Sequence, residues 1–151
     1  MKHQHQLAEI AISYKPLPTV TEPPVIITSL DAYAALQEFF SIETINLQEQ
    51  FVVLYLNKAH RLIGGYRLSK GGITGTVADV RLILSVALKT LATAIILAHN
   101  HPSNNLRPSM EDEAVTRKIK KAADLMQIDL LDHLILSSDN YYSFGDNGLM
   151  K

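Results

Sequence analysis

Three residues near the middle of the chain have the types and spacing of metal ligands. His99 and His101 stand two positions apart, directly after the apolar run of residues 94–98, and Asp112 follows in the next segment. Side chains two positions apart in an extended chain project to the same side, so both imidazoles can face one ion. Neutral imidazole and carboxylate oxygen are natural zinc ligands. A His-x-His pair alone is weak evidence, because a polar loop has the same pattern.

Asp112 has two interpretations, and the sequence leaves both open. Ser109-x-x-Asp112 has the pattern of a capping box, in which the two side chains accept hydrogen bonds from free amides at a helix start. Asp112 also lies on the apolar stripe of the helix that follows, which contains Val115, Ile119, Ala122 and Met126. An ionised carboxylate that faces inward is costly unless it is paired or bound to metal. The position therefore favours a metal ligand.

A three-ligand zinc site of this kind needs a general base. Two histidines and one aspartate leave a position for water on a tetrahedral zinc, and a base must reach that water. Glu49 immediately precedes the apolar run of residues 51–56, so it can lie at the rim of the same sheet. From spacing alone the rival glutamates are Glu38, Glu43, Glu111 and Glu113.

The segments that would position these residues alternate between strands and helices. Expected strands cover residues 51–56, 61–68, 94–98, 130–136 and 141–144, and expected helices cover about 29–40, 80–91 and 109–127. Ser29, Asp79 and Ser109 are the expected caps at the helix starts. This alternation predicts one α/β domain in which a mixed β-sheet is flanked by helices.

Composition narrows the chemistry. The chain has 151 residues, 47% of them hydrophobic and 19% charged, which is typical of a globular domain. It has no cysteine, so a metal site must use histidine, carboxylates and water. The net charge of −1 gives no bulk attraction to nucleic acid or to anionic membranes. Neither a signal peptide nor a run of ~20 apolar residues is apparent, so we expect a soluble cytoplasmic protein.

The domain boundaries follow from proline and glycine. Residues 1–27 read as an N-terminal arm with an edge strand at 8–14 and four prolines after it, and residues 28–151 read as the domain. Two loops, residues 69–76 and 103–107, flank the expected site, and we expect them to set substrate specificity.

The spacing of the candidate ligands resembles a known family. His99-x-His101, seven intervening residues, Ser109, two more residues and Asp112 match the JAMM (MPN+) motif, and Glu49 stands where that motif has its upstream glutamate. More narrowly, the chain resembles the bacterial RadC family (JAB domain) from about Thr28 to Leu149. The resembling segments are residues 97–103, 108–109, 112, 116–117, 131–133 and 141–144.

The resemblance implies both a fold and a reaction. The fold is the cytidine deaminase-like (JAB/MPN) arrangement of a sheet flanked by helices. His99, His101 and Asp112 would bind Zn2+, Glu49 would act as acid and base, and Ser109 would help to stabilise the oxyanion. The implied function is a zinc-dependent hydrolase, a metallopeptidase or isopeptidase in which zinc-activated water attacks an amide carbonyl of an unknown peptide substrate.

Two departures from the family pattern affect these expectations. Asn104 stands where the family usually has glycine, which we expect to alter the loop but not the ligands. Full-length RadC proteins also carry an upstream helix-hairpin-helix region associated with DNA, and we expect this chain to lack it. The family's link to DNA repair therefore does not carry over directly.

Other functions compete with the hydrolase. A metal-dependent nuclease is the second enzyme class, although HNH nucleases spread their motif over a ββα unit instead of three consecutive residues. A zinc-binding module that serves DNA repair through partners is the third. The basic residues of the last long helix, 117–121, favour a solvated surface over a nucleic-acid contact. His133 either makes a structural hydrogen bond or orients a metal ligand, and Arg81 either serves the family's function or forms a salt bridge.

Overall fold

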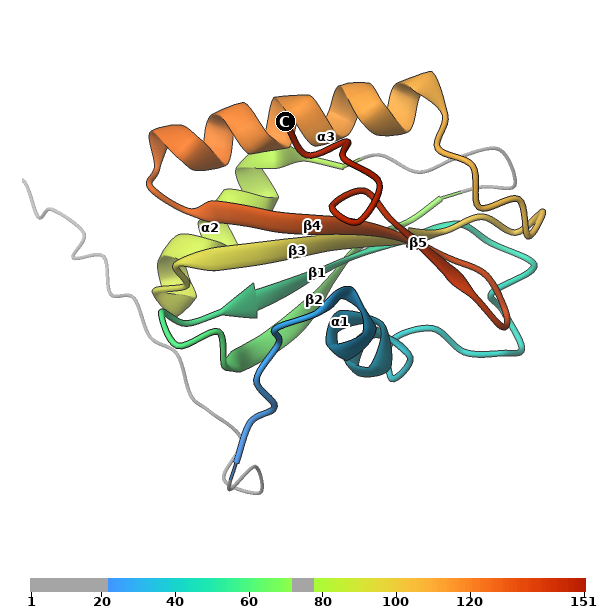
Figure 1. Cartoon of the computed structure of the whole chain (residues 1–151), viewed down its shortest axis with the longest axis horizontal. Helices are drawn as coiled ribbons and strands as arrows, with labels where there is room; N and C mark the ends of the chain where they lie inside the picture. The colour runs from blue at the N-terminus through green and yellow to red at the C-terminus, as the bar shows by residue number, and fades with distance from the viewer. Residues whose placement is uncertain (1–21, 72–77) are drawn as a thin grey trace, which may run out of the picture.

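The described residues alternate between strands and helices and form a mixed five-stranded sheet with three helices, as the sequence predicted. The computed structural model describes residues 22–71 and 78–151 (Figure 1). The expected edge strand at residues 8–14 and most of the loop at 69–76 lie outside the described residues. The strands are β1 (Gln50–Leu56), β2 (Leu62–Lys70), β3 (Ala94–Asn100), β4 (Asp129–Leu136) and β5 (Tyr141–Ser143), and the helices are α1 (Ser29–Leu36), α2 (Val80–Thr90) and α3 (Met110–Leu125).

The sheet has the strand order β2-β1-β3-β4-β5. β3 and β4 are parallel and all other neighbours are antiparallel. A parallel pair needs a crossover connection, and α3 supplies it across one face of the sheet (Figure 1). β1 and β3 are buried along their whole length, which explains why both read as continuous apolar runs in the sequence.

Helices cover both faces of the sheet, so the core has two halves. On one face, α1 contributes Ala32 and Leu36 to a cluster with alternate residues of β1, β3 and β4. On the other face, α2 and α3 contribute Ile83 and Ile119 to a second cluster (Figure 1). The candidate ligand His99 follows Leu97 on the second face, because side chains alternate along a strand.

Two expected helices differ from the prediction. The first helix is capped by Thr28 and not by Ser29, because Thr28 and Asp31 form a capping box. It ends at Leu36, whereas the sequence predicted an end near residue 40. In α3 the buried stripe runs through Thr116, Ile119 and Ala123 and not through Ala122 and Met126, of which Met126 is 44% exposed. No described helix has the length and apolar character that a bilayer crossing requires.

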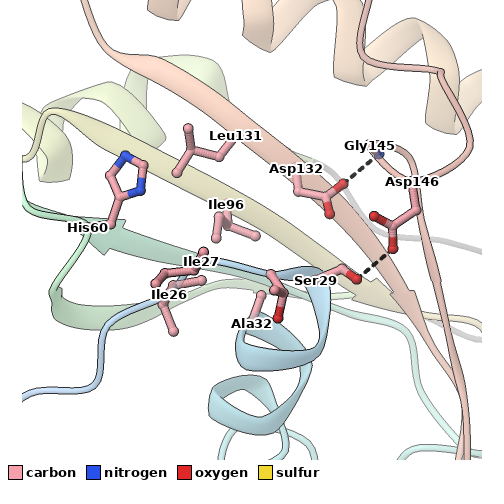
Figure 2. A pocket seen from close by; sticks show the side chains of 11 residues that line it. Ile26, Ile27, Ser29, Ala32, His60, Ile96, Leu131, Asp132, Gly145 and Asp146 are labelled. Atoms are coloured by element: carbon pink, nitrogen blue, oxygen red, sulfur yellow. Dashed lines mark hydrogen bonds between the residues drawn. The ribbon is translucent and has the colours of Figure 1, made fainter.

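The face covered by α1 carries a cavity of about 410 Å3 whose lining includes Asp132 and Asp146 (Figure 2). The buried carboxylate of Asp132 accepts hydrogen bonds from Ser143 Oγ at 2.6 Å, the Gly145 amide at 2.8 Å and the His133 amide at 2.7 Å. Because Asp132 faces the opposite side of the sheet from His99, this cavity is separate from the candidate ligands.

Two adjacent glycines of β2 allow a matched test of packing on the α1 face. A Cβ atom at Gly65 would lie 2.2 Å from Cζ of Phe39, whereas one at Gly64 would have no atom within 4 Å. We therefore expect Gly65→Ala to destabilise the protein by roughly 1 to 3 kcal/mol, because the ring must move. Gly64→Ala should change stability by less than ~0.5 kcal/mol. Urea unfolding of both variants measures the difference, and equal stabilities would contradict the packing described.

Candidate metal centre

His99, His101 and Asp112 converge on one point, as the sequence predicted for metal ligands. The Nε2 atoms of the two histidines are 3.0 Å apart. His99 Nε2 lies 3.2 Å from one carboxylate oxygen of Asp112, and His101 Nε2 lies 3.3 Å from the other. One ligand atom of each residue lies within 4.8 Å of the others, so the cluster can hold a metal ion. It is the only such cluster found in the described residues.

The two histidines come together because β3 stays extended to its end. β3 runs to Asn100, so His99 and His101 project to the same side and Asn100 projects to the other. The His99 side chain is 1% exposed and that of His101 is 17% exposed. The ligand set therefore has a buried side and a side open to solvent.

Asp112 reaches the histidines from the first turn of α3. Its backbone amide donates to Ser109 Oγ at 3.0 Å, and its carboxylate accepts from the Ser109 amide at 2.8 Å. This is the predicted capping box, and the same carboxylate contacts both imidazoles. The capping interpretation is therefore correct, and the carboxylate also has the position that a metal ligand would need. Anchoring the carboxylate to the helix start removes most of its rotational freedom.

The loop after β3 selects the tautomer of His101. His101 Nδ1 lies 2.6 Å from the backbone oxygen of Asn105. A carbonyl oxygen can only accept, so Nδ1 carries the hydrogen and the neutral ring keeps its lone pair on Nε2, the atom that faces Asp112. Asn104 has a φ of 61° within this turn, which is a left-handed conformation that glycine adopts freely and asparagine tolerates. The asparagine thus adopts a backbone conformation that a glycine would also adopt at this position.

The electrostatics of the metal-free cluster favour an ion pair. Burial raises the pKa of Asp112, but hydrogen bonds with His101 and with the Ser109 amide outweigh burial and hold that pKa well below its ordinary value. Burial lowers the pKa of His101, but Asp112 and the Asn105 carbonyl outweigh it, so the pKa of His101 lies above 6.5. A bound cation would replace the proton of His101 as the partner of Asp112.

Glu49 lies beside the same cluster. β1 runs antiparallel to β3 with Phe51 opposite His99, so the residues that precede β1 adjoin the end of β3. A hollow of about 120 Å3, here called the site hollow, is lined by Glu49, Phe51, Ala78, His99, Glu111, Asp112 and Val115. Burial raises the pKa of Glu49, the Asp112 carboxylate raises it further, and the two imidazoles partly offset both effects. Of the rivals, only Glu111 also lines the site hollow, and it is exposed.

Asn100 fixes the segment that carries Glu49, and sequence reasoning gave it no role. Its Nδ2 donates to the backbone oxygens of Ile45 at 2.7 Å and Gln48 at 2.9 Å, and its Oδ1 accepts from the Gln50 amide at 2.8 Å. These bonds bracket Glu49 on both sides. The alternation along β3 is a signal that could have found this role, because a polar residue between two ligands must face the interior.

The remaining candidates have simpler surroundings. Ser109 lies at the start of α3 next to Asp112, as expected. Arg81 is exposed and pairs with Asp79 at 3.0 Å. In the basic segment of α3, Arg117 pairs with Glu113 and Lys120 pairs with Asp124, which is ordinary for a solvated helix face.

His133 is buried beside the ligands, and burial holds its pKa well below 6.5. Its Nε2 lies 2.8 Å from His99 Nδ1, and its Nδ1 lies 2.6 Å from Thr116 Oγ1. His133 therefore touches a candidate ligand directly. Thr116 had no individual role in the sequence prediction.

The donor set fits zinc. Two imidazole nitrogens and one carboxylate oxygen are the ligands expected of a three-residue zinc site. The site hollow lies beside this cluster and has room for a further ligand. The sheet, its three helices and this cluster together define a JAB/MPN-like α/β domain with a candidate metal centre at the end of β3.

Comparison with known proteins gives the family. The sequence model of the RadC-like JAB domain matches residues 26–149. A UPF0758 protein of Flavobacterium johnsoniae is 44% identical over 124 residues, which are 82% of this chain and 53% of that protein. A UPF0758 protein of Porphyromonas gingivalis is 50% identical over 104 residues, which are 68% of this chain and 46% of that protein. The chain belongs to the RadC-like JAB domain family, and it spans about half the length of these curated relatives.

The raised pKa of His101 predicts opposite effects of pH on the metal-free and zinc-loaded protein. In the metal-free protein, protonated His101 contributes stability that is present below pH 6.5 and is lost as the pH rises through the raised pKa. Zinc requires the neutral ring, so the stabilisation by zinc should grow over the same interval. Thermal unfolding of the wild type and of His101→Gln, with and without zinc, measures both effects. If the metal-free wild type were more stable than His101→Gln by the same amount at every pH, the raised pKa of His101 would be contradicted.

Proposed function

We propose that the chain is a zinc-dependent hydrolase that cleaves an amide bond, with His99, His101 and Asp112 as the zinc ligands. The observation that carries the proposal is the convergence of these three side chains on one point, beside a hollow that His99 and Asp112 line together with Glu49. Membership of the RadC-like JAB domain family supports it. The proposed substrate is a peptide or an isopeptide.

Each residue of the site has a distinct chemical task. Zinc bound there would polarise the substrate carbonyl and make a water molecule more acidic. Glu49 would accept a proton from that water and return it to the departing amine. Its raised pKa suits this role, because a base whose pKa lies closer to neutrality can also release the proton. Phe51, which is buried, contributes an apolar side chain to the lining of the same hollow.

Ser109 is suited to stabilise the oxyanion. Its Oγ accepts a hydrogen bond from the Asp112 amide, and its hydroxyl hydrogen has no acceptor among the described residues. The hydroxyl can therefore donate to negative charge that develops on a carbonyl oxygen. The capping bond holds Oγ beside the ligand Asp112, so the donor is positioned before the substrate arrives.

Replacing Glu49 by glutamine separates the base from the metal ligands. Glu49→Gln keeps the size of the side chain and removes the proton acceptor, so we expect hydrolysis to fall by at least ~100-fold while zinc content stays the same. The measurement is turnover of a panel of peptides and isopeptide-linked peptides, with zinc content determined on the same samples.

Two further glutamates serve as comparisons. Glu38→Gln changes an exposed residue outside the site hollow and should leave turnover unchanged. Glu111→Gln tests the one rival that lines the site hollow. Larger loss in Glu111→Gln than in Glu49→Gln would transfer the role of base to Glu111. Wild-type protein that binds zinc but cleaves none of the panel would favour the binding-module alternative.

A further inference from the structure

A continuous line of hydrogen bonds connects two of the candidate ligands through residues that are not ligands. Thr116 Oγ1 lies 2.6 Å from the backbone oxygen of Asp112 and 2.6 Å from His133 Nδ1. His133 Nε2 lies 2.8 Å from His99 Nδ1. Thr116 is 2% exposed, His133 is 0% exposed and His99 is 1% exposed, so water does not compete for these bonds. The line joins α3, β4 and β3.

The direction of each bond follows from one group that can only accept. The backbone oxygen of Asp112 carries no hydrogen, so the hydroxyl of Thr116 must donate to it. That hydroxyl has a single hydrogen, so it accepts from His133, and the hydrogen of His133 is on Nδ1.

Burial fixes the remaining step. The ring of His133 is fully buried and makes no ion pair with a described residue, so it is neutral and its Nε2 bears a lone pair. His99 must therefore donate from Nδ1 to His133, which leaves the lone pair of His99 on Nε2. Nε2 is the atom that faces His101 and Asp112.

We propose that Thr116 and His133 are positioning residues that hold His99 in the tautomer able to bind the metal. The inference rests on the metal site of the proposed function and not on the reaction. The Asn105 carbonyl in the loop after β3 selects the tautomer of His101 by accepting from its Nδ1. The Nδ1 of His99 bonds to His133 instead, so the tautomer of His99 depends on His133. The line from Asp112 through Thr116 and His133 performs for the buried ligand what that carbonyl performs for the exposed one.

Packing against aromatic neighbours fixes the orientation of the His133 ring. It stacks on Phe144 at a centroid distance of 4.7 Å and an interplanar angle of 17°. Phe51 stacks in turn on His99 at 5.9 Å and 3°. The His133 amide also donates to the buried carboxylate of Asp132 on the opposite face of the sheet. These contacts orient the ring, but only Thr116 decides which of its nitrogens carries the hydrogen.

Thr116→Val tests the proposal, because valine has nearly the shape of threonine and lacks the hydroxyl. The expected result is a zinc dissociation constant at least tenfold higher than in the wild type, measured by competition with a chromophoric zinc chelator. Thr116→Ser restores the hydroxyl and should recover most of the affinity. Thr90→Val is the matched control, since Thr90 also donates from a helix to the oxygen of the residue four positions earlier and lies away from the ligands.

Nuclear magnetic resonance of the histidine side chains gives a second readout in the metal-free protein. In the 15N-labelled wild type, His133 and His99 should each show a protonated Nδ1 and an unprotonated Nε2. In Thr116→Val, both rings should lose this single-tautomer signature, while Thr90→Val should keep it. A protonated Nε2 on His133 in the wild type would overturn the proposal, as would equal zinc affinities in the folded Thr116→Val and Thr90→Val variants.

These measurements are independent of catalysis. A wild type that shows the expected tautomers and binds zinc, but hydrolyses no amide, would contradict the proposed function and leave the positioning role supported. Hydrolysis that depends on zinc, together with unchanged affinity in Thr116→Val, would support the proposed function and overturn the positioning role.

Discussion

Asp112 places a carboxylate whose side chain is only 14% exposed between two imidazoles, and its contacts must offset the loss of hydration. The start of α3 supplies part of this compensation, because the Ser109 amide donates to the carboxylate. His101 supplies the rest as a cation, or both histidines supply it as co-ligands of a cation. The position of α3 over the sheet is therefore coupled to the end of β3 by charge as well as by apolar packing.

The antiparallel pairing of β1 with β3 determines what this carboxylate meets. Because Phe51 is opposite His99, the chain just before β1 lies at the end of β3, and Asn100 anchors that chain from within the sheet. A shift of the register by one residue would turn His99 to the α1 face and separate it from Asp112. The full burial of both strands makes such a shift costly, so the apolar core protects the geometry of the polar site.

Features that leave a periodic pattern in the sequence could be predicted from it, and features that depend on tertiary contacts could not. The strands around His99 and Asp132 followed from apolar runs, and Asp112 followed from helical spacing. Glu49 had four rivals in the sequence; the register of β1 and β3 places Glu49 at the end of β3, and three of the rivals do not line the site hollow. Thr116 looked like any polar residue of a helix, because its partner His133 is distant in sequence and reaches it only after β4 pairs with β3.

The two candidate histidine ligands are held by different means, so one side of the candidate site is more buried than the other. His99 is fixed from the buried interior, whereas His101 is fixed by the backbone of a loop and remains 17% exposed. Exchange of a metal ion requires a path to solvent, and His101 and Asp112 are more exposed than His99. Glu49 lies just before β1 and lines the site hollow next to His99. A buried inner ligand with a more exposed outer ligand would thus let a metal ion bind without disturbing the buried contacts of Asn100, which anchor the chain around Glu49.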